Sequence, residues 1–231
     1  MLTVRHLSKT YPPATDALRD VSFTLEARRT LAIIGASGSG KSTLARCLAG
    51  FEQPTSGEIE LNGPIQLIFQ QPAASLNPRF TAAEIVEEPL LIQRRPDRRA
   101  CAIAAVEQVG LRAADLEKPS RHFSGGEKQR LAIARALVVE PKLIILDESL
   151  TGLDPGLQSQ IVGLLRVLQS RLGLTYILIS HDLALAAGFA SEIGVMHEGR
   201  MVEHAAASEI LARPQHSVTC DLIAAAKALA V

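Results

Sequence analysis

The sequence has few cysteines, few aromatic side chains and no excess of charge of either sign. Its 231 residues include three cysteines and no tryptophan, and only 3% of them are aromatic. Cys47, Cys101 and Cys220 form no Cys-x-x-Cys pair, so their spacing favours neither a disulfide framework nor a zinc site and is typical of a reducing compartment. The 24 basic residues balance the 24 acidic ones, which predicts no nucleic acid partner.

Long apolar runs are missing as well. No run approaches the roughly 18 residues that a membrane-spanning helix needs, and the first residues lack the apolar stretch of a signal peptide. The sequence therefore predicts a soluble protein. Its 47% of hydrophobic residues suffices for a globular core and excludes disorder as the main state.

Short apolar strands alternate with helical segments along most of the chain. Apolar runs at 30–34, 143–146 and 176–180 are typical of buried strands, and helices are predicted at 42–49 and 127–139. This alternation predicts an α/β fold with a parallel core sheet. Further strands are predicted at 2–7, 21–25, 58–61, 65–69 and 193–196, and further helical patterns at 161–172 and at 82–116, where Pro89 and Pro96 interrupt the pattern.

A glycine-rich loop lies between the strand at 30–34 and the helix at 42–49. The run Gly35-Ala-Ser-Gly-Ser-Gly-Lys-Ser42 satisfies the G-x-x-x-x-G-K-[ST] pattern of phosphate-binding loops. Its glycines let backbone N–H groups turn toward phosphate oxygens, and the helix N-terminus adds positive potential. A plain glycine-rich connector is the alternative, which the flanking strand and helix disfavour. The predicted nucleotide-binding residues here are Gly35, Ala36, Ser37, Gly38, Ser39, Gly40, Lys41, Ser42 and Thr43.

Two carboxylates, Asp147 and Glu148, follow the buried strand at 143–146. They lie at the carboxyl end of that strand, where α/β sheets bind their ligands. Asp147 and the Ser42 hydroxyl are predicted to hold Mg²⁺, Lys41 to contact the β- and γ-phosphates, and Glu148 to polarise an attacking water. A strand that ends in an ordinary polar turn is the alternative, and the phosphate loop upstream favours the functional interpretation.

The run Phe123-Ser-Gly-Gly-Glu-Lys-Gln-Arg130 lies between these two elements and closely resembles the signature of ATP-binding-cassette (ABC) ATPases. Ser124, Gly125 and Gly126 would form another anion site at a helix N-terminus, where Ser124 also serves as the N-cap. The resemblance implies that this segment completes the ATP site of a facing subunit, so that two cassettes enclose two nucleotides.

The resemblance extends from Leu2 to about Thr219 and covers further residues. It implies that Tyr11 stacks on adenine and that Asp154 ends the loop that crosses to the partner site. It also implies that Gln70 contacts the γ-phosphate and the metal, and that His181 contacts the γ-phosphate. The implied activity is ATP hydrolysis with ATP and Mg²⁺. The implied catalytic residues are Glu148, His181, Gln70 and Lys41, and the implied metal-binding residues are Ser42, Gln70 and Asp147.

The implied fold is a single P-loop ABC ATPase domain over residues 1–231. It would combine the parallel core sheet with an N-terminal antiparallel β layer and a helical insert at about 72–138. The chain departs from the family pattern at Glu127, where glutamine is usual, and at Ser149, where proline often follows the catalytic glutamate. The loop Ser149-Leu-Thr-Gly152 also departs from the small-residue loop that is common before Leu-Asp.

The runs Pro72-Ala-Ala-Ser-Leu-Asn-Pro-Arg79 and Pro214-Gln-His-Ser-Val-Thr219 resemble the peptide/nickel importer branch, which includes oligopeptide, dipeptide, nickel and opine-metallophore importers. The resemblance implies an ATPase subunit that powers uptake of a metal chelate or of a di- or oligopeptide, and the short Gly63–Ile65 spacing leans toward metal chelates.

The branch also implies a set of partners and a location. The implied partners are a second ABC ATPase subunit, a paralogue rather than a copy, two membrane permease subunits, and a periplasmic or extracellular substrate-binding protein. The implied location is peripheral, at the cytoplasmic face of the inner or plasma membrane.

Two other functional classes are less compatible with the sequence. A soluble ABC ATPase of translation or DNA repair would usually carry two cassettes or a long coiled coil, whereas this chain has one phosphate loop, one signature and no heptad tract. In a simpler P-loop kinase or GTPase, the Ser124–Gly126 segment and His181 would have no purpose.

Overall fold

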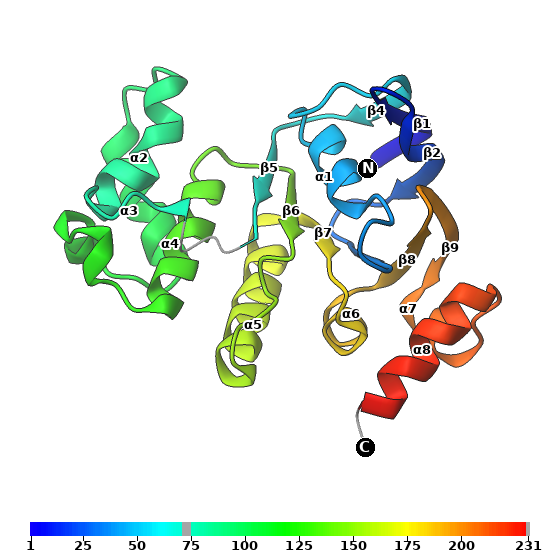
Figure 1. Ribbon diagram of the computed structural model, residues 1–231. Coiled ribbons are helices and arrows are strands. Elements are labelled where there is room, and N and C mark those ends of the chain that lie inside the picture. Colours follow the sequence, from blue (N-terminus) through cyan, green and yellow to red (C-terminus); the bar gives the residue numbers. More distant parts are fainter. Residues whose placement is uncertain (71–74, 230–231) are drawn as a thin grey trace.

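A six-stranded sheet forms the centre of the molecule (Figure 1). The computed structural model describes residues 1–70 and 75–229. The strand order is β5 (Ile65–Ile68), β6 (Leu143–Asp147), β7 (Thr175–Ile179), β3 (Thr30–Ile34), β8 (Glu192–His197) and β9 (Arg200–Ala206). The first five strands in this order, including β3, run parallel to one another, which confirms the predicted core sheet. Strand β9 was not predicted; it pairs antiparallel with β8 at the edge of the sheet.

An antiparallel sheet lies beside the first one and confirms the predicted N-terminal layer. Its order is β2 (Thr15–Leu25), β1 (Leu2–Tyr11) and β4 (Ser56–Leu61). Strand β1 is longer than the predicted 2–7, because its pairing with β2 continues through register shifts as far as Tyr11 opposite Thr15. Tyr11 therefore ends a strand.

Different elements cover the two faces of the central sheet: the antiparallel sheet and one helix lie on one face, and further helices lie on the other. Side chains on β3 show this division: Leu31 and Ile33 belong to a core cluster with α1 (Lys41–Leu48) and the N-terminal sheet. Ala32 and Ile34 belong to the cluster that contains α4 (Gly125–Leu137) and α5 (Pro155–Leu172). Burial on both faces explains why the central strands consist of continuous apolar runs.

The helical insert lies to one side of the central sheet (Figure 1). It contains α2 (Ala82–Ile92), α3 (Arg98–Gln108), the short 3-10 turns Ala113–Glu117 and Ser120–His122, and then α4. The predicted interruption at Pro89 is wrong: α2 continues through it, because burial of Ile85, Val86 and Leu90 outweighs one lost backbone hydrogen bond. The predicted start of the insert and residues 72–74 of the importer-like run lie outside the described residues.

The remaining helices complete the chain. They are α6 (Leu183–Phe189), α7 (Ala207–Ala212) and α8 (Ser217–Leu229). Helix α5 begins six residues before the predicted 161, because Asp154 caps it and Pro155 occupies its first turn, a start signal that the sequence contained. Across residues 1–70 and 75–229, no helix has the length and apolar character needed to cross a membrane.

Candidate nucleotide-binding and hydrolysis site

The phosphate loop connects β3 to the N-terminus of α1, and the side chain of Lys41 folds back into it. Lys41 Nζ donates hydrogen bonds to the carbonyl oxygens of Gly35 and Ala36, each at 2.8 Å. The lysine is only 6% exposed. Burial lowers the pKa of its ammonium group, and the charges of Glu148 and Asp147 oppose that shift. A cation is thus held within the loop, where phosphate oxygens would replace the two carbonyl oxygens.

Two neighbouring segments enclose this loop. A Cβ on Gly40 would lie 2.4 Å from the Ala17 carbonyl oxygen of β2, and one on Gly35 would lie 2.2 Å from the Met196 carbonyl oxygen of β8. The backbone N–H of Gly199, in the turn between β8 and β9, donates to the Ser39 carbonyl oxygen at 3.1 Å. The backbone of the loop is therefore fixed from both sides before any ligand binds.

Ser42 and Asp147 are brought together as predicted for a metal site. Ser42 Oγ donates to Asp147 Oδ1 at 3.1 Å. Burial raises the pKa of the Asp147 carboxyl group, and the hydrogen bond from Ser42 opposes the shift. Hydroxyl and carboxylate oxygens are ligands that suit Mg²⁺. The described residues contain no group of three or more His, Cys, Asp or Glu able to hold a metal, so an ion here would take its other ligands from phosphate or water.

Three predicted catalytic side chains meet where neighbouring parallel strands end. Glu148 follows β6, Gln70 follows β5 and His181 follows β7. Gln70 Nε2 donates to Glu148 Oε2 at 3.3 Å, and His181 Nδ1 lies 3.8 Å from Glu148 Oε1. The Glu148 backbone has φ of 48°, unusual for a glutamate, and its N–H donates to the Ile179 carbonyl oxygen at 3.0 Å. This arrangement can hold and deprotonate a water beside the phosphate loop.

A depression of about 250 Å³ lies over the phosphate loop. Its walls include Lys41, Ser42, Thr43 and Glu148. The other lining residues are Ser37, Gly38 and Gly40 of the loop and Thr15, Asp16 and Ala17 of β2. The β2 residues were not predicted, and no local pattern marks them, because their place depends on how the N-terminal sheet packs against the loop.

Tyr11 lies beside this depression and is held by polar contacts. Its hydroxyl donates a hydrogen bond to the Glu52 carboxylate, and the side chain of Thr43 forms a second hydrogen bond to the phenol. The Nζ of Lys9 lies 5.0 Å from the centre of the Tyr11 ring. Glu52 was not among the predicted site residues.

The Ser124–Gly126 segment forms the start of α4. Ser124 is the N-cap: its N–H donates to Glu127 Oε2 at 2.7 Å, and Glu127 N–H donates to Ser124 Oγ at 3.3 Å. The backbone hydrogen bond from Ser124 lowers the pKa of the Glu127 carboxyl group. Glutamate at this position therefore completes a capping box. Gly126 lies against Leu157 of α5, since a Cβ on Gly126 would be 2.9 Å from Leu157 Cδ1.

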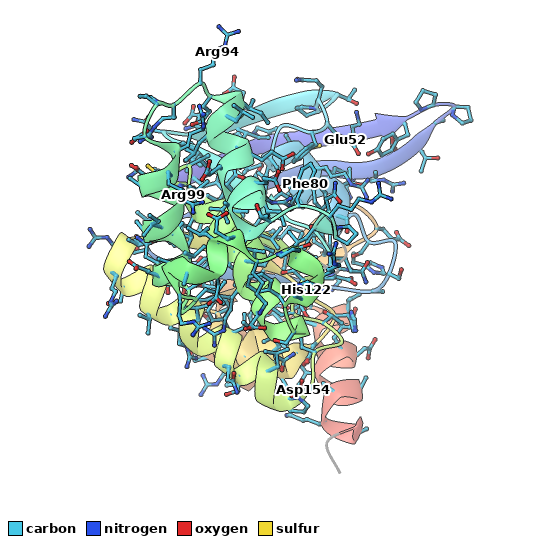
Figure 2. The ribbon with its side chains drawn as sticks, turned by 90° about the vertical axis from the view of Figure 1, so that its left-hand side faces the viewer. Glu52, Phe80, Arg94, Arg99, His122 and Asp154 are labelled. Atoms are coloured by element: carbon cyan, nitrogen blue, oxygen red, sulfur yellow. The ribbon has the colours of Figure 1, made fainter. Side chains whose placement is uncertain are left out.

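The structure does not bring this segment to the phosphate loop. Helices α4 and α1 lie on opposite sides of β5 and β6 (Figure 1). Asp154 caps α5 by accepting a hydrogen bond from Leu157 N–H at 2.9 Å, next to the start of α4. Figure 2 shows Asp154 near the bottom of the view and Glu52 near the top. The predicted residues thus form two separate groups in one chain.

Comparison with known proteins agrees with this geometry. Residues 18–151, more than half of the chain, match the family described as "ABC transporter". The dipeptide transport ATP-binding protein DppF of Haemophilus influenzae is 41% identical over 233 residues, which cover 93% of this chain and 71% of that protein. The peptide transport system ATP-binding protein SapF of Salmonella typhimurium is 39% identical over 248 residues, which cover 97% of this chain and 92% of that protein.

Solved structures have the same fold. The dimeric ATP-binding cassette MJ0796, in a post-hydrolysis state with ADP and Pi, aligns with a TM-score of 0.77 at 28% identity and covers 90% of this chain and 99% of its own. CbiO1 of Clostridium perfringens, part of the ABC transporter complex cbiONQ, aligns with a TM-score of 0.84 at 29% identity. The alignment covers 100% of this chain and 98% of CbiO1. The chain therefore belongs to the ABC transporter family and has the fold of its ATPase domain.

Proposed function

We propose that this chain is the ATP-hydrolysing subunit of an ABC importer for peptides. The proposed hydrolysis rests on one observation: four side chains meet at one edge of the parallel sheet, those of Lys41, Gln70, Glu148 and His181. The similarity to DppF and SapF, which are named as dipeptide and peptide transport proteins, supports the proposed cargo over a metal chelate. The same names favour transport over a role in translation or DNA repair.

The proposed mechanism assigns one task to each group. The loop N–H groups and the Lys41 ammonium bind the phosphates of ATP. Ser42, Asp147 and Gln70 would hold Mg²⁺, which would neutralise charge on the phosphate oxygens when bound. Glu148 accepts the proton of the attacking water, and Gln70 and His181 orient that water and the γ-phosphate from either side of the carboxylate.

A second ABC ATPase subunit completes the site in this proposal. Ser124, Gly125, Gly126 and Asp154 lie away from the phosphate loop of their own chain, and Ser124 and Gly125 are exposed. A helix N-terminus of this kind suits the γ-phosphate held by a facing chain. The dimeric structures of MJ0796 support such pairing. The second subunit would be a paralogue rather than a copy of this chain.

The permease would dock in a groove between the core and the helical insert. This groove, of about 230 Å³, is lined by Phe51 and Phe69 on the core side and by Pro89 and Ile92 of α2. Phe51 is 63% exposed and Ile92 is 78% exposed, and such uncovered apolar side chains mark a protein contact. In this proposal residues 1–231 form a single domain, and residues 72–138 are its helical insert. Motion of the insert would then be transmitted to the two permease subunits.

The proposal places the protein peripherally at the cytoplasmic face of the membrane, with a substrate-binding protein on the other side. Affinity purification of the tagged chain from gently solubilised membranes of its host is expected to recover two permease subunits and a second cassette. Recovery of ribosomal or DNA-repair proteins without a permease would contradict the transport function.

Hydrolysis is tested by Glu148→Gln. The variant replaces the carboxylate with an amide, which still forms hydrogen bonds but cannot act as a base, so ATPase activity is expected to fall by about 10²- to 10⁴-fold while ATP still binds and holds paired cassettes closed. Phosphate release and size-exclusion chromatography with ATP measure the two effects. Glu140→Gln is the matched control, because Glu140 has a similar φ of 53° but lies on the surface after α4. Unchanged hydrolysis in Glu148→Gln would exclude Glu148 as the base.

A further inference from the structure

Glu52 lies among charged and polar side chains next to the Tyr11 hydroxyl. Its carboxylate accepts the hydrogen bond from the Tyr11 hydroxyl, and it also lies 3.2 Å from Arg46 Nη1 and 4.0 Å from Lys9 Nζ. Its side chain is 20% exposed. Two cations and a phenol thus surround this carboxylate, which is less exposed than the carboxylate of an ordinary surface ion pair.

The backbone fixes Glu52 to the same helix that begins with Lys41. After α1 the chain reverses at Gly50, where φ is 75°. The N–H groups of Phe51 and Glu52 then donate to the Arg46 carbonyl oxygen at 2.9 and 3.2 Å. Helix α1 therefore connects the phosphate loop at one end with Glu52 at the other.

Polar contacts hold the Tyr11 side chain next to one wall of the depression. Thr43, which lines the depression, bonds to the phenol oxygen, and Lys9 lies over the ring and also donates to the Gln53 carbonyl oxygen at 2.7 Å. The pKa of Glu52 is lowered, mainly by the hydrogen bond from Tyr11 and to a smaller extent by the contacts with Arg46. The pKa of Tyr11 is raised, mainly by burial and to a smaller extent by Glu52. At neutral pH the carboxylate is charged and the phenol keeps its proton, so the bond is formed.

We propose that Glu52 is a positioning residue for recognition of the nucleotide base, because its carboxylate holds the Tyr11 ring in the orientation that stacks on that base. This inference rests on the proposed function, since it takes ATP as the ligand. A tyrosine at the end of β1 would otherwise sample several rotamers, and binding would have to order it. Holding the ring in advance removes that entropy loss from the binding reaction. Figure 2 shows Glu52 far from Asp154, so the base end and the proposed partner-facing end of the chain are separate.

The test compares ATP with a ligand that has phosphates but no base. In Glu52→Ala, the dissociation constant of Mg·ATP is expected to rise roughly tenfold, while that of inorganic tripolyphosphate stays unchanged. Tyr11→Phe removes only the hydroxyl and should reproduce the loss for ATP, and the double variant should lose no more than either single one. Glu52→Gln retains an acceptor and should restore most of the affinity. Glu58→Ala, at an exposed glutamate of β4, is the control.

The outcomes separate the inference from the proposed function. An equal loss of ATP and tripolyphosphate affinity in Glu52→Ala would mean that Glu52 only supports α1, and it would overturn the inference. Unchanged ATP affinity in Glu52→Ala and Tyr11→Phe would overturn it too, while leaving the ATPase assignment intact. A wild-type protein that binds no ATP would overturn the proposed function and the inference with it.

Discussion

The phosphate loop and the Ser124–Gly126 segment are both rich in small residues, and both precede a helix, yet they are built in opposite ways. The phosphate loop is enclosed by β2 and by the end of β8, and its Lys41 is 6% exposed. Ser124 and Gly125 are exposed, and a Cβ on Gly125 would meet no atom within 4 Å. The conformation of the phosphate loop is therefore held within the chain, whereas the Ser124–Gly126 segment has only its own capping box.

In the proposed pairing of two subunits, each chain would supply the phosphate loop of one site and the Ser124–Gly126 segment of the other. A loop held by its neighbours loses little freedom when phosphate binds, because its conformation is already determined. An open helix N-terminus offers unpaired N–H groups toward the outside, where another subunit's ligand can reach them. The same substitution, glycine to alanine, should therefore have opposite effects in the two regions.

The largest effect is expected from Gly40→Ala. At φ of 101° a side chain is strained, and the new Cβ would lie 2.4 Å from the Ala17 carbonyl oxygen. We expect the free energy of unfolding to fall by about 3 kcal/mol and ATP binding to be lost, measured by denaturant titration and by calorimetry. Gly38→Ala is the control, because φ there is 79° but no atom lies within 4 Å, so only about 1 kcal/mol of strain is expected. Equal losses at the two positions would show that the enclosure of the loop is unimportant.

An intermediate effect is expected at the link between the two regions. Gln129, on α4 and 2% exposed, donates from Nε2 to the Ser149 carbonyl oxygen at 3.0 Å, next to Glu148. Gln129→Leu leaves that buried oxygen unpaired, so we expect a loss of roughly 1 to 3 kcal/mol in unfolding free energy and slower hydrolysis with ATP affinity retained. Gln160→Leu, at an exposed position of α5, should change neither quantity. Normal hydrolysis in Gln129→Leu would mean that α4 does not position Glu148.

The smallest effect on stability, and one of opposite sign, is expected from Gly125→Ala. Alanine in the first turn of α4 meets no atom within 4 Å, so the free energy of unfolding should rise by about 0.5 to 1 kcal/mol. If the segment closes on a facing subunit, hydrolysis by paired cassettes should nevertheless fall. Gly163→Ala, in the middle of α5 and equally unobstructed, should stabilise the chain without slowing hydrolysis. A stabilised Gly125→Ala protein with full activity would contradict the proposed partner contact.

The sequence by itself determined the core strands and the residues at the ends of those strands. The strand at 30–34 matches β3, and the run at 143–146 falls within β6, because a strand buried on both faces must be apolar throughout. The position of Glu148 at the carboxyl end of its strand followed from the same pattern. The roles of Gln70 and His181 were implied by the family resemblance, and the structure brings both side chains close to Glu148.

Tertiary structure alone decided the features that depend on contacts between distant residues. Strand β9 has no continuous apolar run and forms by pairing with β8, and α2 continues through Pro89 because its apolar face is buried. Glu52 reaches Tyr11 across 41 positions of the sequence, and Gly40 meets Ala17 of another sheet. Such contacts leave no local pattern, because their geometry arises only when the sheets and helices pack together; a motif, in contrast, must satisfy its chemistry within a few consecutive residues.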